Sequence, residues 1–219
     1  MNPIFPSILS TNFFDLENRL QEFRVNGIEC IHLDVMDGHF VDNISFGPGT
    51  IPAIRSKFQF IFDSHLMVSN PGKMIPKYST AGSDWISFHA ETDESISDNI
   101  ALIHENGCKA GLVLNPDTAI EKAFPFLDQL DYILIMSVFP GYGGQAFIPA
   151  TLERVVRLRH EIRSRKSQCL IQVDGGITDQ TIGPLKKAGT DLFVIGTHLF
   201  NTPDVGKTLK KIQHLINGV

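Results

Sequence analysis

The chain has 219 residues, of which 42% are hydrophobic and 20% are charged, and its formal net charge at pH 7 is −5. This length suits one domain with a large core, and the negative charge argues against a surface that binds nucleic acid. The first residues lack the features of a signal peptide or membrane anchor, and three widely spaced cysteines without a Cys-x-x-Cys pair indicate reduced thiols. We therefore expect a cytoplasmic protein that binds neither nucleic acid nor a membrane.

Eight short apolar segments, each followed by an amphipathic stretch, run along the chain. They cover residues 4–9, 30–35, 58–68, 84–90, 109–115, 131–138, 169–175 and 191–197. They recur at intervals close to the length of one strand–helix unit, with a longer step between the sixth and the seventh. Near-continuous apolar strands that alternate with helices indicate a parallel sheet covered on its outer face. Eight such units predict an α/β fold, a (β/α)8 TIM barrel in which residues 1–219 form a single catalytic domain.

Local signals support these boundaries. Asn12 with Asp15 three residues later, and Thr178 followed by Asp179, are typical of helix starts. Glycines end several helical stretches just before the next strand, at Gly27, Gly82, Gly107 and Gly189. An open doubly wound sheet is the rival fold, but its usual G-x-G-x-x-G turn after the first strand is absent from "SILSTN".

Ionisable residues stand at the ends of three predicted strands. His32 and Asp34 lie on the second, His65 on the third and Asp174 on the seventh. In a barrel, catalytic groups come from these carboxyl ends, and buried ionisable groups are costly unless they are paired or bind a metal. A lone histidine on an apolar strand is more often a hydrogen-bonded core residue. Four such groups together favour a site for one divalent ion, and mixed nitrogen and oxygen ligands suit Zn, Mn, Fe(II) or Co.

The other histidines have simpler interpretations. His89 lies on the same rim of the predicted barrel, but Glu91 is a ready partner two residues later, so His89 is interpreted as structural or as a support for the ligands. His104, His160 and His214 fall on predicted helices, where surface positions explain them.

Glycine-rich segments follow the last three predicted strands, at 140–145, 174–178 and 196–200. Loops after the late strands of a barrel commonly bind phosphate, and glycine lets backbone N–H groups approach an anion closely. The alternative is that these segments form tight turns only. Because no Lys or Arg lies in them, we expect a bound phosphate to be held by the backbone.

Three methionines lie near the same strand ends: Met36, Met67 and Met136. Core packing explains a methionine adequately. Three on one rim also suit an apolar lid over a flat, electron-rich intermediate, and both interpretations stay open.

Together these groups suit a phosphorylated sugar. A divalent metal polarises a carbonyl as a Lewis acid and holds a developing enediolate. Asp34 and Asp174 come from well-separated strands, so one can remove a proton α to the carbonyl while the other delivers a proton to the opposite face. Two opposed bases invert a stereocentre, which predicts an epimerisation.

Six segments resemble the signature segments of one family, the ribulose-phosphate 3-epimerases. They are "HLDVMDGHFVDN", "HLMV", "LNPDT", "MSVFPGYGGQAFIP", "VDGGIT" and "VIGT". The resemblance runs from "PSIL" to the last strand. It implies an isomerase that interconverts D-ribulose 5-phosphate and D-xylulose 5-phosphate in the pentose phosphate pathway and is commonly a homo-oligomer. It also implies that His32, Asp34, His65 and Asp174 are the metal ligands, with Asp34 as proton acceptor and Asp174 as donor.

The resemblance further implies which residues contact the ketose phosphate substrate. They are Ser7, His65, Gly141, Tyr142, Gly143, Gly144, Asp174, Gly175, Gly176, Gly196 and Thr197. Phe139 and His198 depart from the usual family pattern beside the phosphate loops.

Three other functions are alternatives to this assignment. D-allulose 6-phosphate 3-epimerisation would use the same metal and carboxylates, although the second glycine of "VDGGIT" favours the pentose enzyme. Decarboxylation of the orotidine-phosphate type needs a D-x-K-x-x-D pattern, and Met36 stands where its lysine would be. A non-catalytic sugar-phosphate-binding protein would not need all four ionisable groups.

Overall fold

Eight parallel strands form one sheet that curves into a barrel. The computed structural model describes residues 1–92 and 95–218. The strands are β1 (Ile4–Pro6), β2 (Cys30–Met36), β3 (Ile61–Met67), β4 (Trp85–His89), β5 (Lys109–Leu114), β6 (Tyr132–Met136), β7 (Leu170–Asp174) and β8 (Leu192–Ile195). They pair in the order β1-β8-β7-β6-β5-β4-β3-β2, and a bridge between Ser7 and His32 joins the two ends of the sheet. The predicted barrel is confirmed, and each predicted segment overlaps one strand, with β2 ending one residue beyond its segment.

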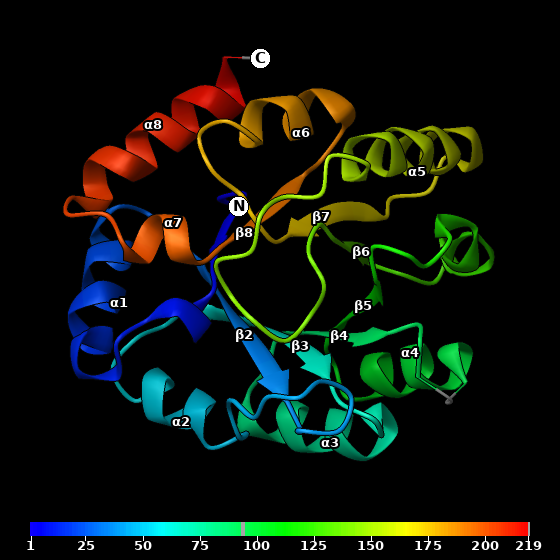
Figure 1. Cartoon of the computed structure of the whole chain (residues 1–219). Coiled ribbons are helices and arrows are strands. Elements are labelled where there is room, and N and C mark those ends of the chain that lie inside the picture. Colours follow the sequence, from blue (N-terminus) through cyan, green and yellow to red (C-terminus); the bar gives the residue numbers. More distant parts are fainter. Residues whose placement is uncertain (93–94, 219) are drawn as a thin grey trace.

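Helices surround the barrel (Figure 1). They are α1 (Leu16–Val25), α2 (Thr50–Arg55), α3 (Pro71–Ala81), α4 (Ile96–Glu105), α5 (Thr151–Arg165), α6 (Ile182–Ala188), α7 (Thr197–Phe200) and α8 (Val205–Asn217). The fifth strand is followed by the 3-10 segment η3 (Ile120–Phe126) in place of the expected α-helix. Pro125 inside this segment has no N–H to donate and restricts the backbone before it, which disfavours an α-helix.

The predicted helix ends are mostly correct. Asn12 caps the 3-10 segment η2 (Phe13–Asp15) that leads into α1, because its side chain accepts a hydrogen bond from the N–H of Phe14. The start predicted at Thr178 is wrong by one turn: α6 begins at Ile182, and Thr178 N–H donates instead to the hydroxyl of Thr181. All four predicted terminal glycines have positive φ, as a helix end closed by a left-handed residue requires.

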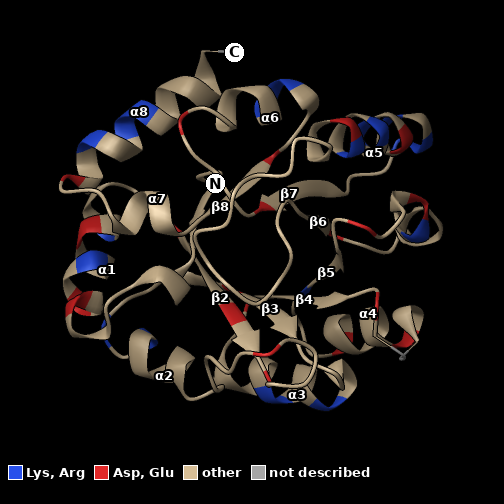
Figure 2. Ribbon diagram, in the orientation of Figure 1, with Lys and Arg blue, Asp and Glu red and all other residues tan. Residues whose placement is uncertain are grey.

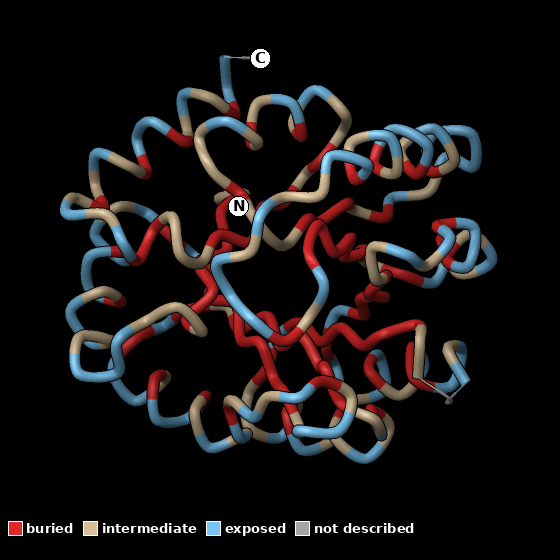
Figure 3. Tube along the Cα trace, in the orientation of Figure 1, coloured by how far each residue is buried: buried red, intermediate tan, exposed pale blue. Residues whose placement is uncertain are grey.

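The two faces of each strand pack against different surroundings. On β2, Ile31, Leu33 and Val35 belong to the core between strands and helices, whereas His32 and Asp34 alternate with them and face the interior of the barrel. Figure 3 shows buried strands at the centre and helices that are buried only along their inner edges. Alternation therefore explains how an apolar strand carries two ionisable groups.

Basic and acidic residues also lie in different parts of the molecule. Lys and Arg lie mainly on the outer helices, such as α5 and α8, whereas β2 carries an acidic residue inside the ring (Figure 2). Among the described residues, no helix has the length and hydrophobicity needed to cross a bilayer.

Candidate active site

Four ionisable side chains meet at the carboxyl end of the barrel. One ligand atom from each of His32, Asp34, His65 and Asp174 lies within 4.8 Å of the others. His65 Nδ1 is 3.2 Å from Asp34 Oδ1 and 4.0 Å from Asp174 Oδ2. The register of β2 and β3 makes Asp34 and His65 direct neighbours, so strand pairing sets this contact. The structure thus brings together all four residues that the sequence placed in a metal site.

His32 presents an unsatisfied nitrogen to this cluster. Its Nδ1 is 2.8 Å from Asp63 Oδ2, and the same buried carboxylate accepts hydrogen bonds from Tyr132 Oη and Gln172 Nε2, each at 2.8 Å. Because the carboxylate only accepts, His32 carries a proton on Nδ1. Its Nε2 lies 3.4 Å from Asp34 Oδ1 and has no hydrogen-bond partner among the described residues.

A divalent cation fits this arrangement. A buried polar atom without a partner is costly, and a bare imidazole nitrogen facing carboxylates becomes satisfied when a cation binds between them. Burial lowers the pKa of His32, but the charges of Asp34 and Asp63 outweigh it and raise that pKa well above its usual value. A proton or a metal ion therefore belongs in this position, and two nitrogen and two oxygen donors match the expected metals.

The two carboxyl groups differ in acidity. Burial raises the pKa of Asp34, but the adjacent His32 and His65 outweigh it and hold the pKa far below its usual value. Burial and the charge of Asp34 together raise the pKa of Asp174 to about 7. At neutral pH Asp34 is therefore ionised, whereas Asp174 carries a proton about half of the time, so the pocket holds one base and one acid.

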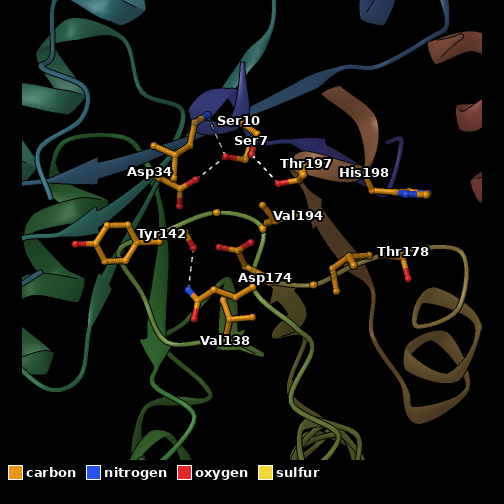
Figure 4. A pocket seen from close by; sticks show the side chains of 18 of the residues that line it. Ser7, Ser10, Asp34, Val138, Tyr142, Asp174, Thr178, Val194, Thr197 and His198 are labelled. Atoms are coloured by element: carbon orange, nitrogen blue, oxygen red, sulfur yellow. Dashed lines mark hydrogen bonds between the residues drawn. The ribbon is translucent and has the colours of Figure 1, made fainter. Parts of the chain in front are cut away.

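A pocket of about 660 Å³ opens above the carboxylates. Asp34 and Asp174 point into it from β2 and β7 (Figure 4), and Ser7 Oγ donates to Asp34 Oδ2 at 2.5 Å. Its lining includes all the predicted substrate residues except His65, namely Ser7, Gly141, Tyr142, Gly143, Gly144, Asp174, Gly175, Gly176, Gly196 and Thr197. Met36, Met67 and Met136 also line it, and their role as a lid stays a prediction. His32 and His65 are fully buried.

The glycine-rich segments pack closely around one side of the pocket. Gly176 has a φ of 60°, and an added Cβ would lie 2.6 Å from the backbone nitrogen of Phe147, so only glycine fits there. Ser10, which was not predicted, places its hydroxyl 3.2 Å from that of Thr197. Lys207 and Lys211 also reach this pocket from α8, so the expectation of a phosphate site without nearby cations is incomplete.

The segment after β6 crosses the mouth of the barrel, where Figure 1 draws it in yellow-green. Asn43, from the loop after β2, donates to the carbonyl oxygen of Gly141 at 3.0 Å and ties the two loops together. Both residues that depart from the family pattern line the pocket: Phe139 is half exposed, and His198 Nε2 lies 3.0 Å from Asp179 Oδ1.

Known proteins resemble this chain along nearly its whole length. The sequence model of the "Ribulose-phosphate 3 epimerase family" matches residues 3–200. A ribulose-phosphate 3-epimerase of Aquifex aeolicus (strain VF5) is 40% identical over 217 residues, covering 99% of this chain and 97% of that protein. One of Bacillus subtilis (strain 168) is 39% identical over 214 residues, covering 97% of this chain and 99% of that protein.

The fold also occurs in solved structures of low sequence similarity. The crystal structure of 3-hexulose-6-phosphate synthase from Salmonella typhimurium has a TM-score of 0.74 over 98% of this chain and 98% of that one. At 16% identity, this likeness shows the fold alone.

Proposed function

The chain belongs to the ribulose-phosphate 3-epimerase family, isomerases that act on a carbohydrate phosphate, and from this premise we propose that it interconverts D-ribulose 5-phosphate and D-xylulose 5-phosphate. One observation carries the proposal: the carboxyl groups of Asp34 and Asp174 reach the same pocket from different strands and have pKa values shifted in opposite directions. A reaction that moves one proton off a carbon and another onto it needs such a pair.

The two carboxyl groups divide the proton transfers. Asp34, held ionised, removes the proton from carbon 3 of D-ribulose 5-phosphate and leaves an enediolate. Asp174 delivers a proton to the opposite face of that carbon, which inverts the centre and gives D-xylulose 5-phosphate. In the reverse direction the two residues exchange roles, because the same transition states are crossed. The hydroxyl of Ser7, already bonded to Asp34, is placed to orient the carboxylate and the substrate.

His32, Asp34, His65 and Asp174 would hold one divalent ion, either Zn, Fe(II), Mn or Co. When bound, this ion supplies Lewis-acid polarisation of the substrate carbonyl. The unpartnered Nε2 of His32 and the mixed donor set support the assignment. Met36, Met67 and Met136 give the pocket an apolar wall that limits access of water to the reacting carbon.

The glycine-rich segments would bind the phosphate. Gly141, Gly144, Gly175 and Gly176 all have positive φ, a conformation that turns backbone N–H groups toward an anion. Gly196 and Thr197 complete this side of the pocket. We further infer a cytoplasmic homo-oligomer of the pentose phosphate pathway, which rests on family membership.

One observation favours a second substrate. The pocket continues past the glycine-rich segments to Lys207 and Lys211 on α8, and its volume of about 660 Å³ leaves room for a longer chain than a pentulose phosphate. D-allulose 6-phosphate, a ketohexose phosphate epimerised by the same chemistry, is therefore the alternative. A non-catalytic sugar-phosphate-binding protein is a weaker one, because nothing in such a role calls for the two carboxylates.

The substrate is settled by offering both sugars. Metal-loaded protein is given D-ribulose 5-phosphate or D-allulose 6-phosphate, and the C3 epimer is quantified by proton NMR. We expect a kcat/KM for D-ribulose 5-phosphate well above that for D-allulose 6-phosphate. A reversed preference would move the protein to the alternative, and turnover of neither sugar would contradict the epimerase assignment.

A further inference from the structure

The side of His65 that faces away from the cluster contacts a second buried histidine. His65 Nε2 and His89 Nε2 are 2.8 Å apart, and the two rings stack with centroids 5.0 Å apart. On the other side of His89, Nδ1 lies 3.1 Å from Glu91 Oε2. A continuous chain of three side chains thus leads from the cluster to Glu91, which is partly exposed to solvent.

The carboxylate of Glu91 determines which atom donates and which accepts in the hydrogen bonds between Glu91, His89 and His65. Burial raises the pKa of Glu91, but hydrogen bonds from His89 and from neighbouring groups outweigh it and lower the pKa to about 2. An ionised carboxylate only accepts, so His89 Nδ1 carries a proton. The Nε2 of a neutral His89 then accepts, and His65 Nε2 donates to it. A neutral His65 consequently presents a bare Nδ1 to Asp34 Oδ1 at 3.2 Å, and a cation bound between these two acceptors satisfies both.

If donor and acceptor were exchanged in these hydrogen bonds, two acceptors would come into contact at Glu91. If His65 Nδ1 donated to Asp34, His89 Nε2 would have to donate to His65, and the bare Nδ1 of His89 would face the carboxylate of Glu91 at 3.1 Å. Two acceptors in contact inside a protein repel each other. Among the described residues, the group that could hold a metal ion includes His65 and Asp34 but neither His89 nor Glu91, so a cation relieves only the contact at the cluster.

We propose that Glu91, acting through His89, holds His65 in the tautomer whose Nδ1 is ready to bind a metal ion, so that His89 and Glu91 are positioning residues for this ligand. The arrangement differs from that of His32, which Asp63 orients by direct contact. The consequence for metal binding rests on the metal site of the proposed function. Without the ion, a proton on His65 has a partner on either side, His89 Nε2 or Asp34 Oδ1, so the tautomer is assigned to the metal-bound protein.

The tautomer is tested first, in the wild-type protein loaded with zinc. Nitrogen-15 NMR of the imidazole rings distinguishes a protonated nitrogen from a bare one. We expect the proton on Nε2 of His65 and on Nδ1 of His89. A proton on Nδ1 of His65 would overturn the proposal. If the wild-type protein binds no zinc, the proposed metal site fails and this proposal fails with it, whereas zinc binding with the proton on Nε2 of His89 contradicts this proposal alone.

The energetic consequence is tested with variants at His89, by calorimetric titration with zinc. His89→Leu removes the acceptor and should weaken zinc binding by about 10- to 100-fold, the usual effect of losing a group that orients a ligand. His89→Gln should restore most of the affinity, because its amide oxygen accepts from His65 while its NH₂ group donates to Glu91. Rescue by this variant separates positioning from simple packing.

Phe88→Leu is the matched control, since Phe88 is buried on the same strand but belongs to the core on the outer face. It should lower stability without changing zinc affinity. Equal zinc affinities in His89→Leu and Phe88→Leu would overturn the proposal. If His89→Leu does not fold, Glu91→Gln replaces it: this change at a partly exposed position removes the charge that sets the direction, and should shift His65 toward the Nδ1–H tautomer and weaken zinc binding.

Discussion

Gly111 on β5 is a position where one methyl group should disturb both stability and the metal site. A Cβ added there would lie 2.4 Å from Cζ of Tyr132, more than 1 Å inside the contact distance of about 3.5–4.0 Å preferred by carbon atoms. The ring has little room to move, because it is fully buried and packs on Trp85 with centroids 5.1 Å apart. Its hydroxyl also donates to Asp63, the residue that orients His32.

The expected cost combines two effects. Overpacking a close-packed core costs about 1–3 kcal/mol, and breaking a buried hydrogen bond to a charged group costs about 1.5–3 kcal/mol. Gly111→Ala should therefore lower the free energy of unfolding by about 2.5–6 kcal/mol. Zinc affinity should also fall, because a displaced Tyr132 leaves Asp63 less firmly held.

Urea unfolding of the metal-free protein measures this cost. Gly183→Ala is the control, since an added Cβ there meets no described atom within 4 Å and the residue lies in α6; this change should stabilise the protein by about 0.5–1 kcal/mol. In a Tyr132→Leu background, where the ring is absent, the penalty of Gly111→Ala should shrink. A stability of Gly111→Ala within about 1 kcal/mol of the wild type would refute the reasoning.

Three further predictions concern other parts of the molecule. Lys166 ends α5 in the left-handed conformation, with a φ of 57°, so Lys166→Gly should raise the free energy of unfolding by about 0.5–1 kcal/mol in urea titrations; an unchanged value would contradict this. Asp34→Asn should lower kcat by about 10²–10⁴-fold while the circular dichroism spectrum stays native, and a near-normal rate would remove Asp34 as the base. The pKa of His32 is raised well above its usual value, so its Nε2 carries a proton in the metal-free protein at pH 6.5; metal uptake should release this proton, and affinity should fall as the pH decreases. Calorimetry in two buffers of different ionisation enthalpy would detect this release, and a heat independent of buffer would contradict it.

The sequence predicted the barrel and the cluster because both depend on short-range patterns. Apolar strands recur with helices between them, and residues two apart on a strand share a face, so His32 and Asp34 could be placed together. The same rule applies to Asp63, two residues before His65, and to Gln172, two residues before Asp174. Both were missed because each was read as part of an apolar run.

Other features depend on contacts between segments far apart in the sequence. Lys207 and Lys211 reach the pocket from α8, and nothing in the local sequence there indicates a binding site. The chain from His65 through His89 depends on the packing of β3 beside β4, which fixes a distance that periodicity does not specify. Proline inside η3 was a visible signal, and its presence explains why the fifth unit lacks an α-helix.

Proton exchange at carbon 3 tests the two-carboxylate epimerisation most directly. Metal-loaded protein is given D-ribulose 5-phosphate in heavy water, and proton NMR follows carbon 3 in product and remaining substrate during the first part of the reaction. Two opposed acids predict that D-xylulose 5-phosphate forms with deuterium at carbon 3, while the remaining D-ribulose 5-phosphate is labelled more slowly. Product that keeps its original proton at carbon 3, or the absence of product, would contradict the account.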